Sequence, residues 1–299
     1  MIQFVNAKIN IGLQIVARRE DGYHELQTLF YPIGVYAGLP DNPTQFCDII
    51  EINLNDKSKS GSADRDRITF IQSGNAVDCP PENNLAVKAA HLFFDTFIPD
   101  FSAEIRLEKH IPDGAGIGGG SADATFVLRM LNDLSGVNAD YTALSSLALK
   151  LGADCPFFLL NKPAYACGVG EKLELLECDD PLRSYWLLLV KPDVYISTKE
   201  AFSGVHPHPS DFNLKSVFEV PVEEWRNYVH NDFEDSIFPA HPEFALIKEE
   251  IYHTEALYAS LTGSGSCLYG IYKDKDAATE AQRVLQKFPT IMGTYLLKL

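Results

Sequence analysis

The chain reads Ile111-Pro-Asp-Gly-Ala-Gly-Ile-Gly-Gly-Gly-Ser-Ala-Asp123 near its middle, and five of the seven residues from Gly114 to Gly120 are glycine. An alternating segment, 102–108, precedes this run, and an apolar segment at helical spacing, 124–131, follows it. Glycine lets a ligand approach the backbone closely, and a helix start offers free N–H groups at the positive end of the helix dipole. The order strand, glycine run, helix predicts a phosphate-binding loop rather than a flexible linker.

Two common phosphate-loop motifs do not fit this stretch. The Walker A motif requires a lysine where this chain has Gly120. The dinucleotide-binding fingerprint matches at three glycines, but it also requires an acidic residue at a strand end about twenty residues on. Asp140 lies near that distance in a turn that follows a helix. The loop therefore belongs to another class.

Composition limits the classes of protein. The chain has 299 residues, of which 46% are hydrophobic and 22% charged, as in a globular protein of up to two domains. We expect no membrane segment, because no apolar run approaches about 18 residues, and no signal peptide, because Lys8 and Asn10 interrupt the segment Met1–Val16. The net charge of −16 argues against a nucleic-acid partner. The six cysteines show no metal-binding spacing, so we expect free thiols in a reducing cytoplasm.

The remaining elements follow from periodicity and turn residues. We predict strands at 4–15, 26–35, 64–72 and 184–190, and helices at 85–97, 141–151, 242–252 and 277–288. A turn falls at 21–24, and a mostly polar region runs from 203 to 224. We expect a domain boundary near residue 160, which gives one domain over 1–160 and another over 161–299.

Three further segments have two interpretations each. Lys8 lies in an apolar strand, where the pattern alone slightly favours a solvent-facing position over a buried one near an anion. Asp154, directly after a helix, is more often a cap or turn former than a catalytic base. The turn Thr262-Gly-Ser-Gly265 suits a tight hairpin as well as a ligand loop.

Taken together, these motifs point to a known family. The order Asn6-Ala-Lys-Ile-Asn10, Asp21-Gly-Tyr-His24, the glycine loop, Gly152-Ala-Asp154 and Thr262-Gly-Ser-Gly265 resembles the GHMP kinase superfamily. The first two motifs and the Gly-Ala-Asp segment are those of the branch that phosphorylates a CDP-linked methylerythritol. The resemblance spans most of the chain and is weakest over about 203–250.

The resemblance implies an α+β fold of two domains. The N-terminal domain would resemble domain 2 of ribosomal protein S5 and bind ATP, and an α/β-sandwich C-terminal domain would help close the site. The implied reaction is transfer of the γ-phosphoryl group of ATP, with Mg²⁺, to the 2-hydroxyl of 4-diphosphocytidyl-2-C-methyl-D-erythritol (CDP-methylerythritol). This is a step of the non-mevalonate isoprenoid pathway.

The resemblance also assigns roles to residues. Asp154 matches the catalytic aspartate that accepts the hydroxyl proton, and Lys8 matches the lysine that keeps it ionised and stabilises developing charge. Tyr23 and Phe202 match aromatics that sandwich the cytosine, and His24 matches the reader of its edge. Asn10 and Thr198 match positions that contact the substrate. The residues that would bind the ATP phosphates are Pro112, Asp113, Gly114, Ala115, Gly116, Ile117, Gly118, Gly119, Gly120, Ser121 and Ala122.

The chain departs from the family pattern within the loop. Asp123 stands where the family usually has asparagine, and it either points away from the phosphates or helps to hold Mg²⁺. Asp113 and Ala115 replace residues that are often Gly or Met. Core packing is the alternative role for Tyr23 and Phe202.

Two other functions remain open. A homoserine or sugar kinase of the same superfamily would have no use for the Asp21–His24 turn. A catalytically inactive ligand sensor on this fold would be favoured by loss of Lys8 or Asp154, and both are present.

Overall fold

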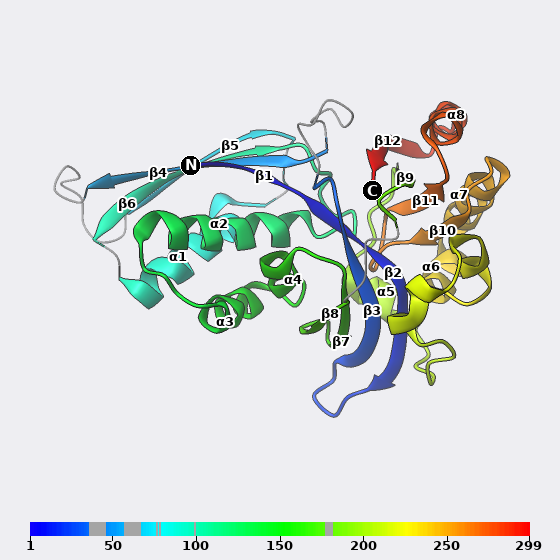
Figure 1. Cartoon of the computed structure of the whole chain (residues 1–299), viewed down its shortest axis with the longest axis horizontal. Coiled ribbons are helices and arrows are strands. Elements are labelled where there is room, and N and C mark those ends of the chain that lie inside the picture. The colour runs from blue at the N-terminus through cyan, green and yellow to red at the C-terminus, as the bar shows by residue number, and fades with distance from the viewer. Residues whose placement is uncertain (36–45, 57–66, 76, 78, 99, 177–181) are drawn as a thin grey trace. The chain divides into compact units, whose positions relative to one another are not determined.

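The computed structural model describes residues 1–35, 46–56, 67–75, 77, 79–98, 100–176 and 182–299. The chain forms two compact units (Figure 1). Unit 1 comprises Met1–Ala7, Thr44–Asp113 and Gly118–Asn161, and unit 2 comprises Lys8–Pro43, Gly114–Ile117 and Lys162–Leu299. The glycine loop therefore belongs to both units, because Gly114–Ile117 group with unit 2 and the residues on either side of them with unit 1.

Unit 1 contains a four-stranded sheet. Its strands, in order across the sheet, are β1 (Ile2–Val5), β4 (Asp48–Asp56), β6 (Phe101–Lys109) and β5 (Ile68–Gly74). β4 is antiparallel to both β1 and β6, whereas β5 runs parallel to β6, because a helix connects them. Ile50 pairs with Leu107 and Ile52 with Ile105, and all four side chains are buried. Their alternation with polar residues gives the sheet one buried face.

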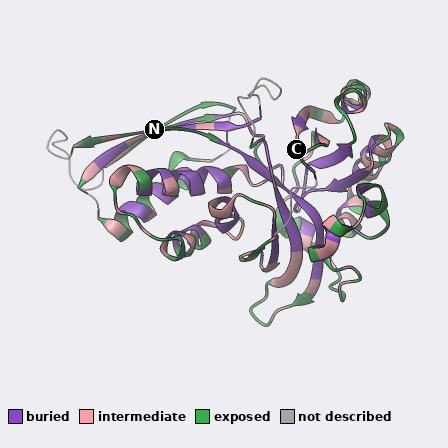
Figure 2. Ribbon diagram, in the orientation of Figure 1, coloured by how far each residue is buried: buried purple, intermediate pink, exposed green. Residues whose placement is uncertain are grey.

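Helices cover one face of this sheet (Figure 1). They are α1 (Leu85–Phe97), α2 (Gly119–Ser135), α3 (Tyr141–Leu151) and α4 (Cys155–Leu160), with the 3₁₀ turn η2 (Pro81–Asn83) before α1. The Asn84 side chain caps α1 by accepting from Ala86 N at 2.9 Å, and Asp140 caps α3 through Ala143 N at 2.8 Å. Most of α2 is buried (Figure 2).

Unit 2 contains two sheets, and the first holds the predicted turn. Its strands are β2 (Ala7–Arg18), β3 (His24–Ile33), β7 (Ala164–Gly168) and β8 (Lys172–Leu175), in that order. Between β2 and β3, Arg19 N donates to Tyr23 O at 2.8 Å, and the Asp21 carboxylate accepts from Tyr23 N at 3.1 Å. The Asp21–His24 motif is thus a hairpin turn closed by its own aspartate.

The second sheet of unit 2 is antiparallel, and all its strands except the half-buried β12 are almost wholly buried. Its strands are β10 (Tyr258–Leu261), β11 (Leu268–Tyr272), β9 (Trp186–Pro192) and β12 (Ile291–Lys298), in that order. The helical elements are α5 (Thr198–Ser203), η3 (Leu214–Glu219), η4 (Val222–Asn227), α6 (Phe233–Ala240), α7 (Pro242–His253) and α8 (Lys275–Leu285). Leu188, Val190, Phe233, Ile247 and Ile251 belong to one core cluster, which ties β9 to α6 and α7.

The mixed α and β architecture confirms the predicted fold class. The predicted strand 4–15 is two strands, β1 and β2, which separate at Asn6. β5 covers the later part of predicted strand 64–72, whose first residues lie outside the described ranges. Among the described residues, no disulfide joins the five cysteines, and Cys178 lies outside them. None of the described helices has the length and apolar character needed to cross a membrane.

Candidate active site

Two glycine-rich segments of unit 2 meet backbone to backbone. Gly114 and Gly116 have φ of 60° and 73°. A Cβ on Gly116 would lie 2.4 Å from Thr262 O, and one on Gly263 would lie 2.8 Å from Gly116 O. Only glycine allows this approach. The hairpin interpretation of the 262–265 turn is confirmed, because the turn joins β10 to β11, whereas its role as a ligand loop stays a prediction.

Lys8 lies directly beneath this contact. Its Nζ donates to Asn10 Oδ1 at 2.7 Å and to Gly116 O at 3.2 Å, and it lies 5.0 Å from the centre of the Phe30 ring. Only 2% of Lys8 is exposed. The solvent-facing position that the pattern alone favoured is wrong, since tertiary contacts bury this strand on both faces. An ammonium group is thus held at the glycine loop.

Asn10 holds this lysine in place. Its amide accepts from Lys8 and donates to Thr28 Oγ1 at 2.9 Å, and its backbone N donates to Thr262 Oγ1 at 3.1 Å. Asn10 is itself buried. In this structure its side chain orients Lys8, and the predicted contact of Asn10 with the substrate stays a prediction.

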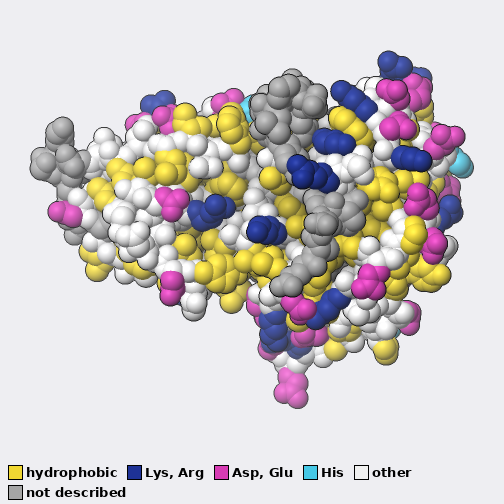
Figure 3. Space-filling view, in the orientation of Figure 1, with side chains coloured by type: hydrophobic (Ala, Val, Ile, Leu, Met, Phe, Trp, Pro, Cys, Tyr) yellow, Lys and Arg dark blue, Asp and Glu magenta, His cyan; other side chains and the backbone are white. Residues whose placement is uncertain are grey.

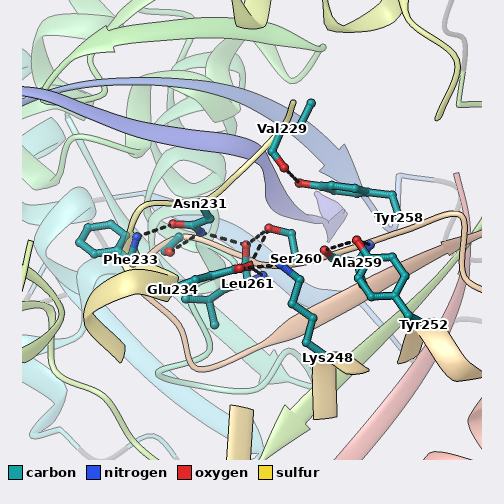
Figure 4. Close-up of polar contacts among 11 residues, drawn as sticks. Val229, Asn231, Phe233, Glu234, Lys248, Tyr252, Tyr258, Ala259, Ser260 and Leu261 are labelled. Carbon is teal, nitrogen blue, oxygen red and sulfur yellow. Dashed lines mark hydrogen bonds and ion pairs between the residues drawn. The ribbon is translucent and has the colours of Figure 1, made fainter. Parts of the chain in front are cut away.

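Asn231 supports the turn from the other side, which the sequence did not predict. Its Nδ2 donates to Leu261 O at 2.9 Å and to Gly263 O at 3.0 Å, while its Oδ1 accepts from Phe233 N at 3.1 Å (Figure 4). Glu234 adds a bond to Leu261 N at 2.8 Å and an ion pair with Lys248 at 2.5 Å. The only sequence signal is a polar residue before a helix, which also fits an ordinary cap.

In unit 1, α2 begins without a capping side chain. Its N-cap is Gly118, in the left-handed conformation with φ of 72°. The first N–H groups of a helix have no partner within the helix, so an uncapped start presents them to a ligand. This arrangement agrees with the phosphate-binding role predicted for Gly118–Ala122.

Asp154 lies next to the start of α2. It is the N-cap residue of α4 and lies in a turn, as the cap or turn interpretation expects, but its side chain makes no capping bond. A Cβ on Gly152 would lie 3.9 Å from Ser121 Oγ, and Thr125 Oγ1 donates to Cys155 O at 2.9 Å. Asp154 is half-buried, and its neighbours Gly152 and Cys155 lie against the first turns of α2. Asp154 belongs to unit 1 and Lys8 to unit 2.

Asp123 points into the interior of unit 1. It is 2% exposed, and its Oδ2 accepts from Lys109 Nζ at 2.8 Å. Of the two alternatives left by the sequence, the structure supports the one in which Asp123 points away from the phosphates. Among the described residues, no three His, Cys, Asp or Glu side chains gather as a metal-binding group.

The aromatic substrate residues lie in unit 2. The rings of His24 and Phe202 stack at 4.8 Å with an interplanar angle of 16°, and Phe202 meets the buried Phe233 edge-on at 4.8 Å. Tyr23 is 64% exposed, which argues against core packing for this ring. Phe202 is half-buried at the margin of the core. Thr198 opens α5, one turn before Phe202.

The chain has a net charge of −16. In Figure 3, acidic side chains are spread across the visible face. An anionic ligand therefore depends on backbone donors and on local cations such as Lys8.

Comparison with known proteins shows which family the chain resembles. Residues 84–162 match the GHMP kinases N terminal domain, and residues 220–290 match the GHMP kinases C terminal domain. The chain is 42% identical over 280 residues to a 4-diphosphocytidyl-2-C-methyl-D-erythritol kinase of Bacteroides thetaiotaomicron, covering 94% of this chain and 95% of the relative. A kinase of the same name from Parabacteroides distasonis is 43% identical over 274 residues, covering 91% and 92%.

A solved structure gives the same result. The crystal structure of a 4-(cytidine 5'-diphospho)-2C-methyl-D-erythritol kinase superimposes with a TM-score of 0.79 at 29% identity, covering 99% of this chain and 98% of the other. The chain therefore belongs to the GHMP kinase family, among the relatives named 4-diphosphocytidyl-2-C-methyl-D-erythritol kinase.

Proposed function

We propose that this chain transfers the γ-phosphoryl group of ATP to the 2-hydroxyl of 4-diphosphocytidyl-2-C-methyl-D-erythritol. The relatives' shared name supports the substrate. The observation that carries the chemistry is the buried Lys8, whose Nζ bonds to the carbonyl of Gly116 in the glycine loop. A fixed cation at a phosphate loop suits phosphoryl transfer, which requires positioning and charge stabilisation.

ATP would bind along residues 112–122. Backbone N–H groups of the loop and of the uncapped start of α2 would hold its phosphates. Mg²⁺ usually binds nucleotide phosphates with one or two protein ligands and several waters, so it would bring charge neutralisation without a dedicated protein cage. The residues proposed for ATP lie in both 1–160 and the GHMP N-terminal match. The division into domains over 1–160 and 161–299 is part of this proposal.

Asp154 would act as the general base. As the 2-hydroxyl oxygen forms its bond to the γ-phosphorus, the bond from that phosphorus to the β–γ bridging oxygen breaks and ADP leaves. The hydroxyl proton passes to an Asp154 carboxylate oxygen. The Lys8 ammonium would stabilise the charge that develops on the transferring group.

The cytidine would bind beside Tyr23, His24 and Phe202. The exposed ring of Tyr23 and the face of Phe202 would enclose the base, and this requires His24 to leave its present stack and bond to the edge of the cytosine. Thr198 and Asn10 would contact the remainder of the substrate. A cytoplasmic location would fit the cysteines of the described ranges, none of which forms a disulfide there.

The deciding experiment is an assay of ATP-dependent phosphorylation of CDP-methylerythritol by the purified chain, in which the release of ADP is measured. Thermal-shift measurements with CDP, cytidine, homoserine and galactose run alongside. The proposal is supported if the wild type turns over the substrate, Asp154→Asn does not, and CDP raises the melting temperature of the chain. Stabilisation by homoserine or galactose instead would indicate another kinase of the family, and ligand binding without any turnover would indicate a sensor.

A further inference from the structure

Three charged side chains are buried together in unit 1 and have no part in the chemistry above. Lys109 Nζ bonds to Asp48 Oδ2 and, at 2.8 Å, to Asp123 Oδ2. The exposed fractions of the three side chains are 5%, 0% and 3%. We call Asp48, Lys109 and Asp123 the buried triad. Two carboxylates thus share one ammonium in the interior.

The buried triad brackets the glycine loop in the sequence. Lys109 is the last residue of β6, where the chain enters the loop, and Asp123 lies in the first turns of α2, where it leaves. Asp48 Oδ1 also accepts from His110 N at 2.6 Å and from Ile111 N at 2.9 Å. Both ends of the loop are therefore tied to the same three side chains.

The two ends also pack directly against each other. A Cβ on Gly119, the first residue of α2, would lie 2.9 Å from Ile111 Cγ2 and 3.6 Å from Lys109 Nζ. The loop entrance thus touches the helix start whose N–H groups would meet the phosphates. A change in the length or direction of the Lys109–Asp123 contact would move those donors.

Stability alone does not account for this arrangement. Burying charges costs desolvation free energy, and apolar side chains of similar volume often stabilise a core equally well. Among the described residues, Asp123 Oδ1 is buried without a hydrogen-bond partner, which adds to that cost. Burial raises the pKa of Asp123 to about 8, although Lys109 opposes the shift.

We infer that the buried triad is a clamp that fixes both ends of the glycine loop and thereby positions its backbone donors for the phosphates of ATP. Asp48, Lys109 and Asp123 are positioning residues, since none of them is placed to touch the ligand. The inference rests on the ATP site of the proposed function. It predicts that weakening the clamp reduces nucleotide affinity beyond any effect on folding.

The test measures ATP affinity of the full chain by calorimetry, well below the melting temperature. Asp123→Ala should weaken ATP binding about ten-fold, because ligand binding must then order the loop. Asp123→Asn keeps an oxygen for Lys109 and should bind ATP nearly as the wild type does. Asn132→Ala is the matched control: Asn132 is buried in the same helix and bonds to Ala139 N at 2.8 Å, but lies at the far end of α2.

In steady-state assays, Asp123→Ala should raise KM for ATP while KM for the CDP-linked substrate stays constant. Asn132→Ala should lower the melting temperature without changing ATP affinity. If Asp123→Ala does not fold, Asp123→Ser, which is also too short to reach Lys109, is measured instead. Unchanged ATP affinity in the short variants, or equal loss in Asp123→Asn, overturns the clamp. Wild-type protein that binds ATP but does not phosphorylate the CDP-linked substrate overturns the proposed function only.

Discussion

Phe202→Ala separates a role in substrate binding from a role in the core. The ring lies parallel to His24 at 4.8 Å and edge-on to Phe233 at 4.8 Å, so it borders both the proposed cytidine site and the core of unit 2. If Phe202 is a platform for the base, its loss acts on substrate affinity. If it only packs against Phe233, its loss acts on folding.

The two effects appear in different measurements, substrate affinity and folding stability. Stacking of a base on an aromatic ring contributes about 1–3 kcal/mol, and about 1.4 kcal/mol corresponds to a factor of ten. Phe202→Ala should therefore raise KM for the CDP-linked substrate about ten-fold or more, with KM for ATP nearly unchanged. Because Phe202 is only half-buried, the loss in stability should be smaller than the roughly 3–5 kcal/mol typical of a fully buried phenylalanine.

The chain offers a matched control in Phe238→Ala. Phe238 is also a partly buried phenylalanine on the same core cluster, and it stacks with Phe244 at 6.3 Å. Both variants should melt at lower temperature, but only Phe202→Ala should change KM for the CDP-linked substrate. Equal losses of stability with both KM values unaltered would refute the stacking role, and the cytidine assignment would then rest on Tyr23 and His24.

Four further outcomes are expected. Asp154→Asn should keep ATP affinity while kcat falls about 10²–10⁴-fold. Lys8→Ala should also lower kcat, and the loss of activity in the double variant should be less than the sum of the two single losses, expressed as free energies. Strict additivity of the two losses would count against a coupled pair. Gly118→Val should abolish ATP binding in calorimetry without unfolding the chain, because valine at φ of 72° is strained and crowds the start of α2. His24→Ala should reduce the ratio of kcat/KM for cytosine over uracil forms of the substrate. Burial raises the pKa of Asp123 to about 8, above its ordinary 3.8, so between these pH values the folded chain keeps a proton that the unfolded chain has lost, and the stability of the wild type falls as pH rises. The melting temperature of Asp123→Asn relative to wild type should therefore increase from pH 5 to pH 8. A constant difference in melting temperature would contradict this pKa.

The elements that the sequence predicted well are those with a local physical cause. The helix 141–151 has a capping aspartate before it and a glycine after it, and it appears with the predicted bounds. The strand predicted over 184–190 contains the unbroken apolar run 186–190, which is typical of a strand buried on both faces, and it corresponds to β9, Trp186–Pro192. The glycine loop was predictable because positive φ and close backbone contact restrict the choice of residue.

The elements that the sequence missed depend on partners far along the chain. β4 lies between β1 and β6, and β8 is only Lys172–Leu175, whose pattern is too short to separate from a loop. β12 pairs with β9, about a hundred positions earlier in the sequence. Their strand character comes from pairing within the sheet, which a single sequence does not reveal.

The same distinction explains the site. The motifs identified Lys8 and Asp154 because each carries chemistry in a specific sequence setting, but Lys109, Asp48 and Asn231 act through contacts that no local pattern encodes. A lysine at the end of an alternating strand normally meets water. Here Lys109 is drawn inside because Asp48 and Asp123 converge on it from a strand and a helix. The sequence thus shows which groups would meet the ligand, whereas the residues that hold the loop in shape are recognisable only once distant carboxylates and amides are seen together.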